Sequence, residues 1–294
     1  MTTKLPISIQ ICTYNEEKDI LRCLHSASNQ NVEEIIVIDG GSRDQTEKIV
    51  KEFRNVKFIK SPIANLTKQR GLGVINSKSD YVAFVDADDN LCEGWAKNLH
   101  AELLEENYSA IGSRIRAVGR THSNFFTSSW DTYFQITIIP SKNCNMVGRP
   151  SIFNRNALES YYSNLASNPD SMMEDVEMSI FFEDLSLLQG ITHRNVESFR
   201  IVPESLRENY AKFFSYGKGY ALTIKQHPAR RVNILRHIFI TQPIIRCLKA
   251  LRLKKFKYPL FVLIQFSGIF AGFCYFNLIE KREYFLLSGR KRLN

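Results

Sequence analysis

Strand-like and helix-like stretches alternate along the first ninety residues, and this alternation constrains the fold more than any other feature. Strands are predicted at 7–14, 33–41, 55–60 and 80–89, with helices between them at about 16–28, 42–53 and 65–77. Ser42 and Gln45 fit a capping box at the start of the second helix. Strands joined by helices of this length need right-handed crossovers, so we expect a mainly parallel sheet. Near-continuous apolar runs are typical of strands covered on both faces, and the predicted fold class is α/β.

The pattern becomes looser after Asn90. A helix is predicted at 94–107, a strand at 108–119, a turn at 148–158, an acidic helix at 172–185 and a late strand at 198–203. The chain is then predicted to be helical from Glu204 to Gln226, and Pro228 marks a break. We therefore expect a domain boundary near Arg230, with a body at 1–229 and a helical extension at 230–294.

Charge is distributed unevenly along the 294 residues, whose net charge is +9. From Arg200 onward there are 19 Lys and Arg against 4 Asp and Glu, or +15. The first 199 residues hold 20 against 26, or −6. An acidic body joined to a basic tail indicates an anionic partner for the tail, either nucleic acid or a membrane surface. The plainer alternative is a solvated basic face.

Two features of the sequence bear on the cellular compartment. The segment MTTKLPISIQICTYNEE has a short apolar run and reaches acidic residues by Glu16, so it lacks the apolar core and cleavage site of a signal peptide. The body is therefore expected in the cytoplasm. The six cysteines are scattered without a C-x-x-C pair, which favours reduced and mostly buried thiols over a disulfide framework or a zinc site.

The stretch YVAFVDADDN places an apolar run directly before Asp86, Asp88 and Asp89. Carboxylates this close repel one another unless a cation or a donor group shares them. Because Asp86 and Asp88 are two residues apart, both side chains would leave an extended segment on the same side. One carboxylate can then bind a hydroxyl while the other ligates Mg²⁺ or Mn²⁺ that bridges phosphates.

Other motifs that contain such acids fit less well. An EF-hand loop from Asp86 would need Gly and Glu where Leu91 and Lys97 stand. A phosphatase with an aspartate nucleophile carries D-x-D on its first strand, whereas this one follows the fourth. A dinucleotide site would need G-x-G-x-x-G, and RGLGVIN offers only Gly71 and Gly73; a P-loop is absent. A solvated loop after a strand remains the plain alternative.

Four motifs taken together resemble a known family. ICTYNEEKDILRCLHS, IVIDGGSRDQTEKI, LTKQRGLGV and VAFVDADD are similar, in order and spacing, to the nucleotide-binding half of glycosyltransferase family 2, which has the Rossmann-like GT-A fold. The resemblance is dense over 7–90 and recognisable to about Pro228. It implies a catalytic domain at 1–229, with a nucleotide-binding half at 1–90 and an acceptor half at 91–229. It also implies an inverting, metal-dependent enzyme that uses a nucleoside-diphosphate sugar, by family frequency a UDP-sugar.

The resemblance also implies roles for individual residues. The D-x-D motif is Asp86-Ala87-Asp88, with Asp88 as the ligand of Mg²⁺ or Mn²⁺. Asp39 is the nucleobase aspartate, and Arg70 is the basic residue near base and diphosphate. The implied nucleotide-binding residues are Thr13, Tyr14, Glu16, Asp39, Arg70, Asp86 and Ala87.

The segment SMMEDVEMSIFF resembles the family's Glu-Asp motif, which implies that Glu174 and Asp175 are catalytic and that Asp175 is the base. Successive helix positions are about 100° apart, so the two acids are not expected to aim at one point. Met173, Val176 and Ile180 form a stripe that would face the core. The plain alternative is a helix N-terminus enriched in acids because of the helix dipole.

An absent motif narrows the predicted function, and three rival hypotheses stay open, the last of them a sugar-binding homologue without catalytic activity. Processive members carry Q-x-x-R-W after the Glu-Asp segment, but the two tryptophans, Trp95 and Trp130, both precede Glu174. Transfer of one sugar per event to a hydroxyl of a glycan or a lipid-linked acceptor is therefore favoured. The first rival is a polyprenyl-phosphate glycosyltransferase, whose anionic acceptor needs no base. The second is a nucleic-acid-binding module that uses the basic tail, although the tail interleaves its charges with aliphatic runs rather than stacking aromatics. No nucleic-acid partner is expected.

Residues 258–279 run without a charge for 22 residues, about 33 Å as a helix against a hydrocarbon core of roughly 30 Å. Basic clusters flank this segment on both sides, so a single span would place one of them outside, against the positive-inside tendency. A re-entrant hairpin or an in-plane helix keeps both on an anionic leaflet, with a span ranked second and a buried helix third. We expect the protein at the cytoplasmic face of the cell membrane. The polar and small residues that lower the segment's apolarity are Gln265, Ser267, Gly268, Gly272 and Asn277.

Overall fold

The structure is a computed structural model that describes residues 3–144, 150–165 and 174–280. The chain divides into two compact units. The sheet unit comprises 1–122, 137–169 and 174–202, and the helical unit comprises 123–136, 170–173 and 203–294. Three parts of the sequence predictions lie outside the described residues: the first two residues of the turn at 148–158, the stripe residue Met173, and the basic cluster at 281–294.

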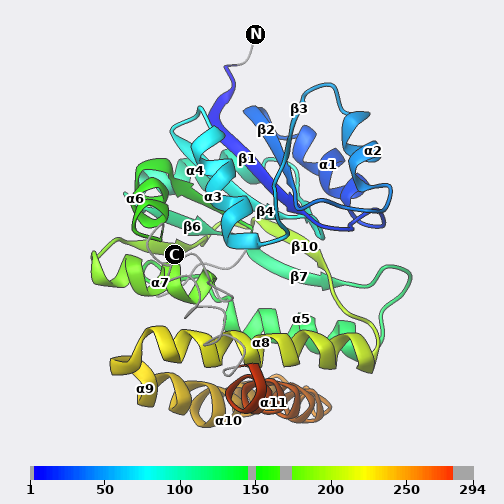
Figure 1. Cartoon of the computed structure of the whole chain (residues 1–294), viewed down its shortest axis with the longest axis vertical. Helices are drawn as coiled ribbons and strands as arrows, with labels where there is room; N and C mark the ends of the chain where they lie inside the picture. Colours follow the sequence, from blue (N-terminus) through cyan, green and yellow to red (C-terminus); the bar gives the residue numbers. More distant parts are fainter. Residues whose placement is uncertain (1–2, 145–149, 166–173, 281–294) are drawn as a thin grey trace, which may run out of the picture. The chain divides into compact units, whose positions relative to one another are not determined.

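A seven-stranded, mainly parallel sheet forms the centre of the sheet unit, as the sequence predicts (Figure 1). Its strand order is β3-β2-β1-β4-β8-β6-β9. The pairs β3–β2, β2–β1, β1–β4 and β6–β9 are parallel, and β8 runs antiparallel to both of its neighbours. The strands are β1 Leu5–Thr13, β2 Val32–Asp39, β3 Val56–Lys60, β4 Tyr81–Asp86, β6 Ala110–Gly112, β8 Ser151–Asn154 and β9 Gln189–Ile191.

Helices cover both faces of this sheet, because successive residues of its strands alternate between two apolar clusters. In β4, Ala83 and Val85 belong to the cluster that includes Trp95 and the first helix, whereas Val82 and Phe84 belong to the other. Each buried side chain of this size contributes about 1.5–3 kcal/mol relative to an exposed one. The helices are α1 Ile20–Ser28, α2 Thr46–Lys51, α3 Leu66–Asn76, α4 Trp95–Glu105, α6 Arg155–Leu165 and α7 Glu174–Asp184.

A second sheet of three strands lies beside the end of β4. Its order is β5-β10-β7, with β5 Asp89–Leu91, β10 Glu197–Ile201 and β7 Arg114–Val118. The strand predicted at 108–119 is therefore two strands, β6 and β7, which separate at Ser113 and join different sheets. β5 and β10 pair antiparallel, so that Arg200 stands opposite Asp89.

Three local predictions are wrong. Residues 151–158, predicted as part of a turn, form β8 and the start of α6, because the antiparallel partners β4 and β6 satisfy the backbone there. The helix predicted from Glu16 begins at Ile20, after Asn15 takes a positive φ of 58°. The predicted capping box at α2 does not form: the helix begins after Gln45, and Ser42 donates instead to Asp39.

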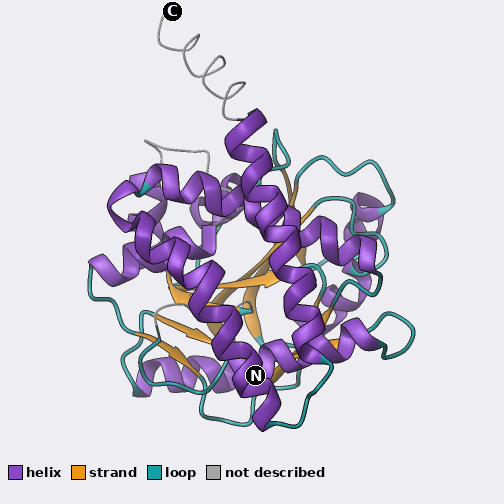
Figure 2. Ribbon diagram, turned by 90° about the horizontal axis from the view of Figure 1, so that it is seen from below, coloured by secondary structure: helices purple, strands orange, loops and turns teal. Residues whose placement is uncertain are grey.

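The helical unit contains only helices and loops among its described residues (Figures 1 and 2). The Trp130 indole donates to Asn209 Oδ1 at 2.7 Å, and its ring lies 5.5 Å from Phe213 and 5.4 Å from Phe261. Residues 258–279 are long and apolar enough to cross a membrane, with a mean hydropathy of 1.7. The helices are α5 Phe125–Thr137, α8 Leu206–Gln226, η1 Pro228–Arg230, α9 Arg231–Arg236, η2 His237–Thr241, α10 Gln242–Arg252, α11 Tyr258–Tyr275 and η3 Phe276–Glu280.

Candidate functional site

Three of the candidate residues stand side by side at the carboxyl edge of the large sheet. Thr13, at the end of β1, pairs in register with Asp39 at the end of β2. On the other side of β1, Cys12 pairs with Asp86 at the end of β4. Ligands of parallel α/β sheets bind outside this edge, so the fold places these residues where the sequence predicts a site.

Asp39 organises the loop that follows β2. One carboxylate oxygen accepts from the Thr13 hydroxyl at 3.1 Å and from the Ser42 hydroxyl, and the other accepts from the amides of Gly41 and Ser42, both at 2.9 Å. The side chain is fully buried. A nucleobase could therefore contact Asp39 only if one of these internal hydrogen bonds were exchanged.

Close packing of α3 against β1 positions Arg70. Gly73 makes this approach feasible, since a Cβ at Gly73 would lie 1.8 Å from the Gln10 amide nitrogen. Gln10 donates from that nitrogen to the carbonyl of Arg70 at 2.9 Å. The neighbouring Gln69 donates to the carbonyls of Thr13 and Ile38 at 3.0 and 2.8 Å, which ties α3 to the ends of β1 and β2.

The buried guanidinium of Arg70 joins the two acidic segments of the sheet unit. Its Nη2 donates to Asp86 Oδ1 at 2.8 Å, and its Nη1 donates to Glu174 and, at 3.4 Å, to Asp175 Oδ1. It also lies 5.2 Å over the Phe84 ring. Burial disfavours the charged form, but the three carboxylates outweigh it and raise the pKa of Arg70 well above its usual value.

A second arginine, Arg200 of β10, holds the acidic turn after β4. It donates to Asp89 through Nε and Nη2 at 2.8 and 2.7 Å, and to Asp86 Oδ2 at 2.8 Å. Its Nε lies 3.8 Å from Asp88 Oδ1. Ala87 and Asp88 form a turn, so the expectation of an extended D-x-D is wrong: Asp89 bends back to accept from the Asp86 amide at 3.1 Å. The positive partners anticipated for this cluster thus include Arg70 and Arg200.

Glu174 and Asp175 meet at a single point, which corrects the expectation that they would diverge. Both carboxylates accept from Nη1 of Arg70 because they lie in the first turn of α7, where neighbouring side chains can converge on one long donor. Glu174 is buried and also accepts from the Tyr162 hydroxyl, whereas the Asp175 side chain is 45% exposed. Burial, followed by the charge of Glu174, raises the pKa of Tyr162.

The cluster is rich in carboxylates. In the part of the chain that the structure describes, five of them (Asp86, Asp88, Asp89, Glu174 and Asp175) lie within reach of the guanidinium groups of Arg70 and Arg200. Burial raises the pKa of Asp89 to about 7 despite Arg200. Burial and the charge of Asp88 likewise raise the pKa of Glu16 to about 7. Oxygens of Asp86, Asp88 and Asp89 lie within 4.8 Å of one another, a donor set that suits a hard divalent cation.

A family model agrees with this geometry. The model of Glycosyl transferase family 2 matches residues 8–162, more than half of the chain, and that stretch includes the ends of β1, β2 and β4. The chain belongs to glycosyl transferase family 2. The family is the one that the motifs of the sequence resemble.

Curated relatives of this family 2 member share only part of their length with it. Glycosyltransferase GlyA of Streptococcus pneumoniae serotype 4 is 31% identical over 136 residues, 44% of this chain and 20% of GlyA. Glycosyltransferase AglE of Haloferax volcanii is 26% identical over 186 residues, 60% of this chain and 57% of AglE. The chain thus spans less than two thirds of these relatives.

The fold is that of a solved glycosyltransferase. The crystal structure of Staphylococcus aureus TarS 1–349 in complex with UDP-GlcNAc superposes with a TM-score of 0.52 at 16% identity, over 88% of this chain and 90% of the TarS chain. This likeness supports the GT-A fold predicted from the motifs.

Sequence reasoning missed Arg200, Gln69 and Tyr162 in this glycosyltransferase. Arg200 left one signal, since three aspartates after β4 and two acids at α7 require more positive charge than Arg70 supplies. Gln69 and Tyr162 left none, because their contacts join segments that are distant in sequence. Of the other predicted residues, Ala87 is buried in the turn, and Tyr14, after the end of β1, is 47% exposed.

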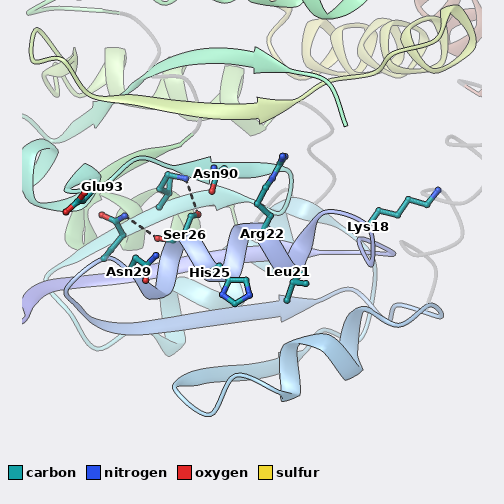
Figure 3. A pocket seen from close by; sticks show the side chains of 10 residues that line it. Lys18, Leu21, Arg22, His25, Ser26, Asn29, Asn90 and Glu93 are labelled. Carbon is teal, nitrogen blue, oxygen red and sulfur yellow. Dashed lines mark hydrogen bonds between the residues drawn. The ribbon is translucent and has the colours of Figure 1, made fainter. Parts of the chain in front are cut away.

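A surface pocket of about 760 Å³ lies beside α1 (Figure 3). Its walls come from Lys18 before α1, from α1 itself, including Arg22 and His25, and from residues that follow the acidic turn. The Leu91 amide donates to the Ser26 hydroxyl at 3.0 Å, which fastens that segment to α1. The residues that line the pocket include none of the predicted site residues.

Proposed function

We propose that this enzyme transfers a sugar from a UDP-sugar to a hydroxyl of a glycan or a lipid-linked acceptor, with inversion and one sugar per event. The observation that carries the proposal is the pairing made by Arg70. One guanidinium contacts both Asp86 of the acidic cluster and the half-exposed Asp175. A diphosphate bound at the cluster would then lie near a carboxylate able to accept a proton. The UDP-GlcNAc bound to TarS supports a UDP donor.

In this proposal Asp175 takes the proton from the acceptor hydroxyl as its oxygen attacks the anomeric carbon. Attack comes from the face opposite the UDP leaving group, so the anomeric configuration inverts. Of the two acids at α7, Asp175 suits this role because Glu174 is buried and already accepts from Tyr162 and Arg70. Arg70, whose Nη1 donates to Asp175 Oδ1 at 3.4 Å, would hold the Asp175 carboxylate in place.

We assign the divalent cation, Mg²⁺ or Mn²⁺, to Asp88, with Asp86 and Ala87 at the nucleotide. The convergence of the Asp86, Asp88 and Asp89 carboxylates supports this assignment. When bound, the ion would offset the charge that develops on the leaving diphosphate. Thr13, Tyr14, Glu16 and Asp39 complete the proposed nucleotide site, with Arg70 on its α3 side.

The proposed working place is the cytoplasmic face of a membrane, where a lipid-linked acceptor would be found. The uncharged helix at 258–279 and the basic residues before it support membrane association.

A thermal-shift panel of nucleotide sugars, each with and without Mn²⁺, tests the donor assignment. A bound donor stabilises the folded state by mass action, so a UDP-sugar at 100 times its Kd would add about 2.7 kcal/mol. We expect stabilisation by UDP-sugars that requires Mn²⁺. Equal shifts from UDP-, GDP- and ADP-sugars, or none at all, would contradict the proposal.

A further inference from the structure

Two of the three charged side chains of helix α10, Arg246 and Lys249, turn toward neighbouring helices of the unit. Arg246 Nη1 donates to Gln265 Oε1 of α11 at 3.2 Å, and its guanidinium lies 4.7 Å over the Tyr133 ring of α5. Lys249 Nζ donates to the carbonyl of Ile136, also in α5, at 3.1 Å. A helix on a water-facing surface normally shows the reverse arrangement, with its charges outward.

The opposite face of α10 is apolar and exposed. Ile244, Leu248 and Leu251 recur at helical spacing on it and are 55%, 54% and 43% exposed. Phe256 in the loop to α11, and Leu260 and Leu263 in the first two turns of α11, are likewise apolar and exposed in the part of the chain that the structure describes. We call these residues the outer face: Ile244, Leu248, Leu251, Phe256, Leu260 and Leu263.

α10 packs on α5 and α11 packs on α8. Because α5 and α8 also pack on each other, the exposed sides of α10 and α11 point in the same direction. α10 is anchored to α5 through Lys249, and α11 is anchored to α8, where a Cβ at Gly272 would lie 1.9 Å from the Phe214 carbonyl. α5 and α8 pack on each other through Trp130 and Phe213. The four helices thus form two layers, with α10 and α11 together in one of them (Figure 1).

The charge around the outer face selects the kind of partner. Residues 228–279 contain nine Lys and Arg and no Asp or Glu. Arg252, Lys254, Lys255 and Lys257 are exposed next to Phe256, where their long side chains can reach a headgroup layer while the apolar groups enter the acyl region. An apolar surface rimmed by positive charge alone complements an anionic leaflet.

The packing of α11 argues against a span. α8 packs closely along α11 at two glycines, Gly217 of α8 and Gly272 of α11. A Cβ added at Gly217 would lie 2.1 Å from the Ile269 carbonyl oxygen. α8 carries Lys212 and Lys218 in its middle turns. If α11 crossed the bilayer, this contact would take those ammonium groups into hydrocarbon, at a cost of several kcal/mol.

We propose that the outer face docks the enzyme on an anionic lipid leaflet, with α10 and α11 lying in the plane of the membrane. This inference rests on the membrane site in the proposed function, but not on the donor, the metal or the transfer step. Its tests therefore use lipid binding, and donor binding in solution is followed separately.

Flotation of the full chain with vesicles tests the surface. We expect binding to phosphatidylcholine vesicles that contain phosphatidylglycerol, and at least tenfold weaker binding to phosphatidylcholine alone. Leu248→Glu and Leu263→Glu should each lower the partition coefficient by on the order of tenfold or more. Ile75→Glu is the matched control, because Ile75 is an exposed apolar residue of α3 outside the outer face. Equal binding of all three variants and the parent would overturn the proposal.

Depth-dependent quenching tests the orientation. Leu248→Trp and Leu263→Trp place fluorophores on α10 and α11, and the signal of the parent's Trp95 and Trp130 is subtracted. We expect both to be quenched most by lipids brominated near the headgroup. Strongest quenching of the Trp at 263 by bromines at the bilayer centre, with none of the Trp at 248, would establish a span and overturn in-plane docking.

Light scattering without lipid tests whether a second copy covers the outer face instead. The proposal expects Leu248→Glu to leave the mass of the particle unchanged. A dimer that dissociates in Leu248→Glu and does not float with vesicles would overturn it. Mn²⁺-dependent UDP binding in solution should be the same in every outer-face variant, so failure of docking and failure of the donor assignment can be told apart.

Discussion

Asp175 and Glu174 are adjacent in sequence but differ in environment, and this difference predicts their mutant phenotypes. Asp175→Asn removes a half-exposed proton acceptor without emptying a buried site. We expect UDP affinity to be unchanged and turnover to fall by about 10²–10⁴-fold, the usual contribution of a general base. Calorimetry with UDP and initial rates with a hydroxyl acceptor measure the two effects. A polyprenyl-phosphate acceptor needs no base, so full activity of Asp175→Asn would favour that rival.

Glu174→Gln is the companion variant. The Glu174 carboxylate is buried between Arg70 and Tyr162. Replacing it with a neutral amide removes one of the negative charges that balance the buried guanidinium of Arg70. We expect the free energy of unfolding to fall by about 3 kcal/mol, the low end of the cost of breaking a buried ion pair. Urea denaturation measures this. If Glu174→Gln and Asp175→Asn behaved alike in both stability and rate, the division of roles would be wrong.

Arg200 is predicted to hold the acidic turn. Arg200→Gln leaves the buried Asp89 without its bidentate partner, so we expect a loss of about 3–5 kcal/mol in the free energy of unfolding. Arg200→Lys should recover part of this loss. Arg116→Gln is the matched control, since Arg116 is more exposed and lies 4.0 Å from Glu197, a surface pair worth under about 1 kcal/mol. Similar urea midpoints for Arg200→Gln and Arg116→Gln would refute this role.

At the scale of residues, the sequence predicts the side chains that lie at strand ends. It misses side chains from other elements that contact those strand ends. Thr13, Asp39 and Asp86 follow from the parallel-strand pattern, because strand ends share one edge. Arg200 is contributed by a strand of a different sheet, and no local pattern links it to Asp89. The roles of the predicted residues in nucleotide binding and catalysis stay predictions.

Helix α11 supplies the prediction at the scale of elements. Gly272→Ala puts a Cβ where the Phe214 carbonyl lies 1.9 Å away, so α8 and α11 must separate. We expect a loss of about 1–3 kcal/mol in unfolding free energy, as for other overpacked sites. Ser267→Ala, on the exposed side of the same helix, should change it by less than about 0.5 kcal/mol. Chemical denaturation compares the two, and equal stability would show that the contact is looser than described.

Secondary structure was predictable where the hydrophobic periodicity was strong. The prediction failed where contacts with residues distant in sequence determine the local structure. The alternation up to Asp86 gave the four parallel strands, since runs buried on both faces leave a clear apolar signal. The stretch 151–154 lacked that signal and was predicted as part of a turn, yet pairing with β4 and β6 makes it a strand. The α2 cap failed for a similar reason, because Asp39 captured the Ser42 hydroxyl.

At the scale of the whole molecule, composition and contacts divide the chain differently. The break at Pro228 predicts a domain boundary near Arg230, and this boundary stays a prediction. Contacts group α5 and α8 with the C-terminal helices, because Trp130, Phe213 and the glycines of α11 join segments far apart in sequence. Such long-range packing leaves no mark in local composition, so only the structure shows it.

The central claim is that a divalent cation at Asp88 supports binding of a UDP-linked donor. Titration calorimetry of UDP with and without Mn²⁺, on the parent chain and on Asp88→Asn, tests this most directly. Asp184→Asn is the control, since Asp184 is an exposed carboxylate of α7. We predict Mn²⁺-dependent affinity in the parent and in Asp184→Asn, and a loss of at least about tenfold in Asp88→Asn with an unchanged melting temperature. An Mn²⁺-dependent UDP affinity in Asp88→Asn equal to that of the parent would contradict the account.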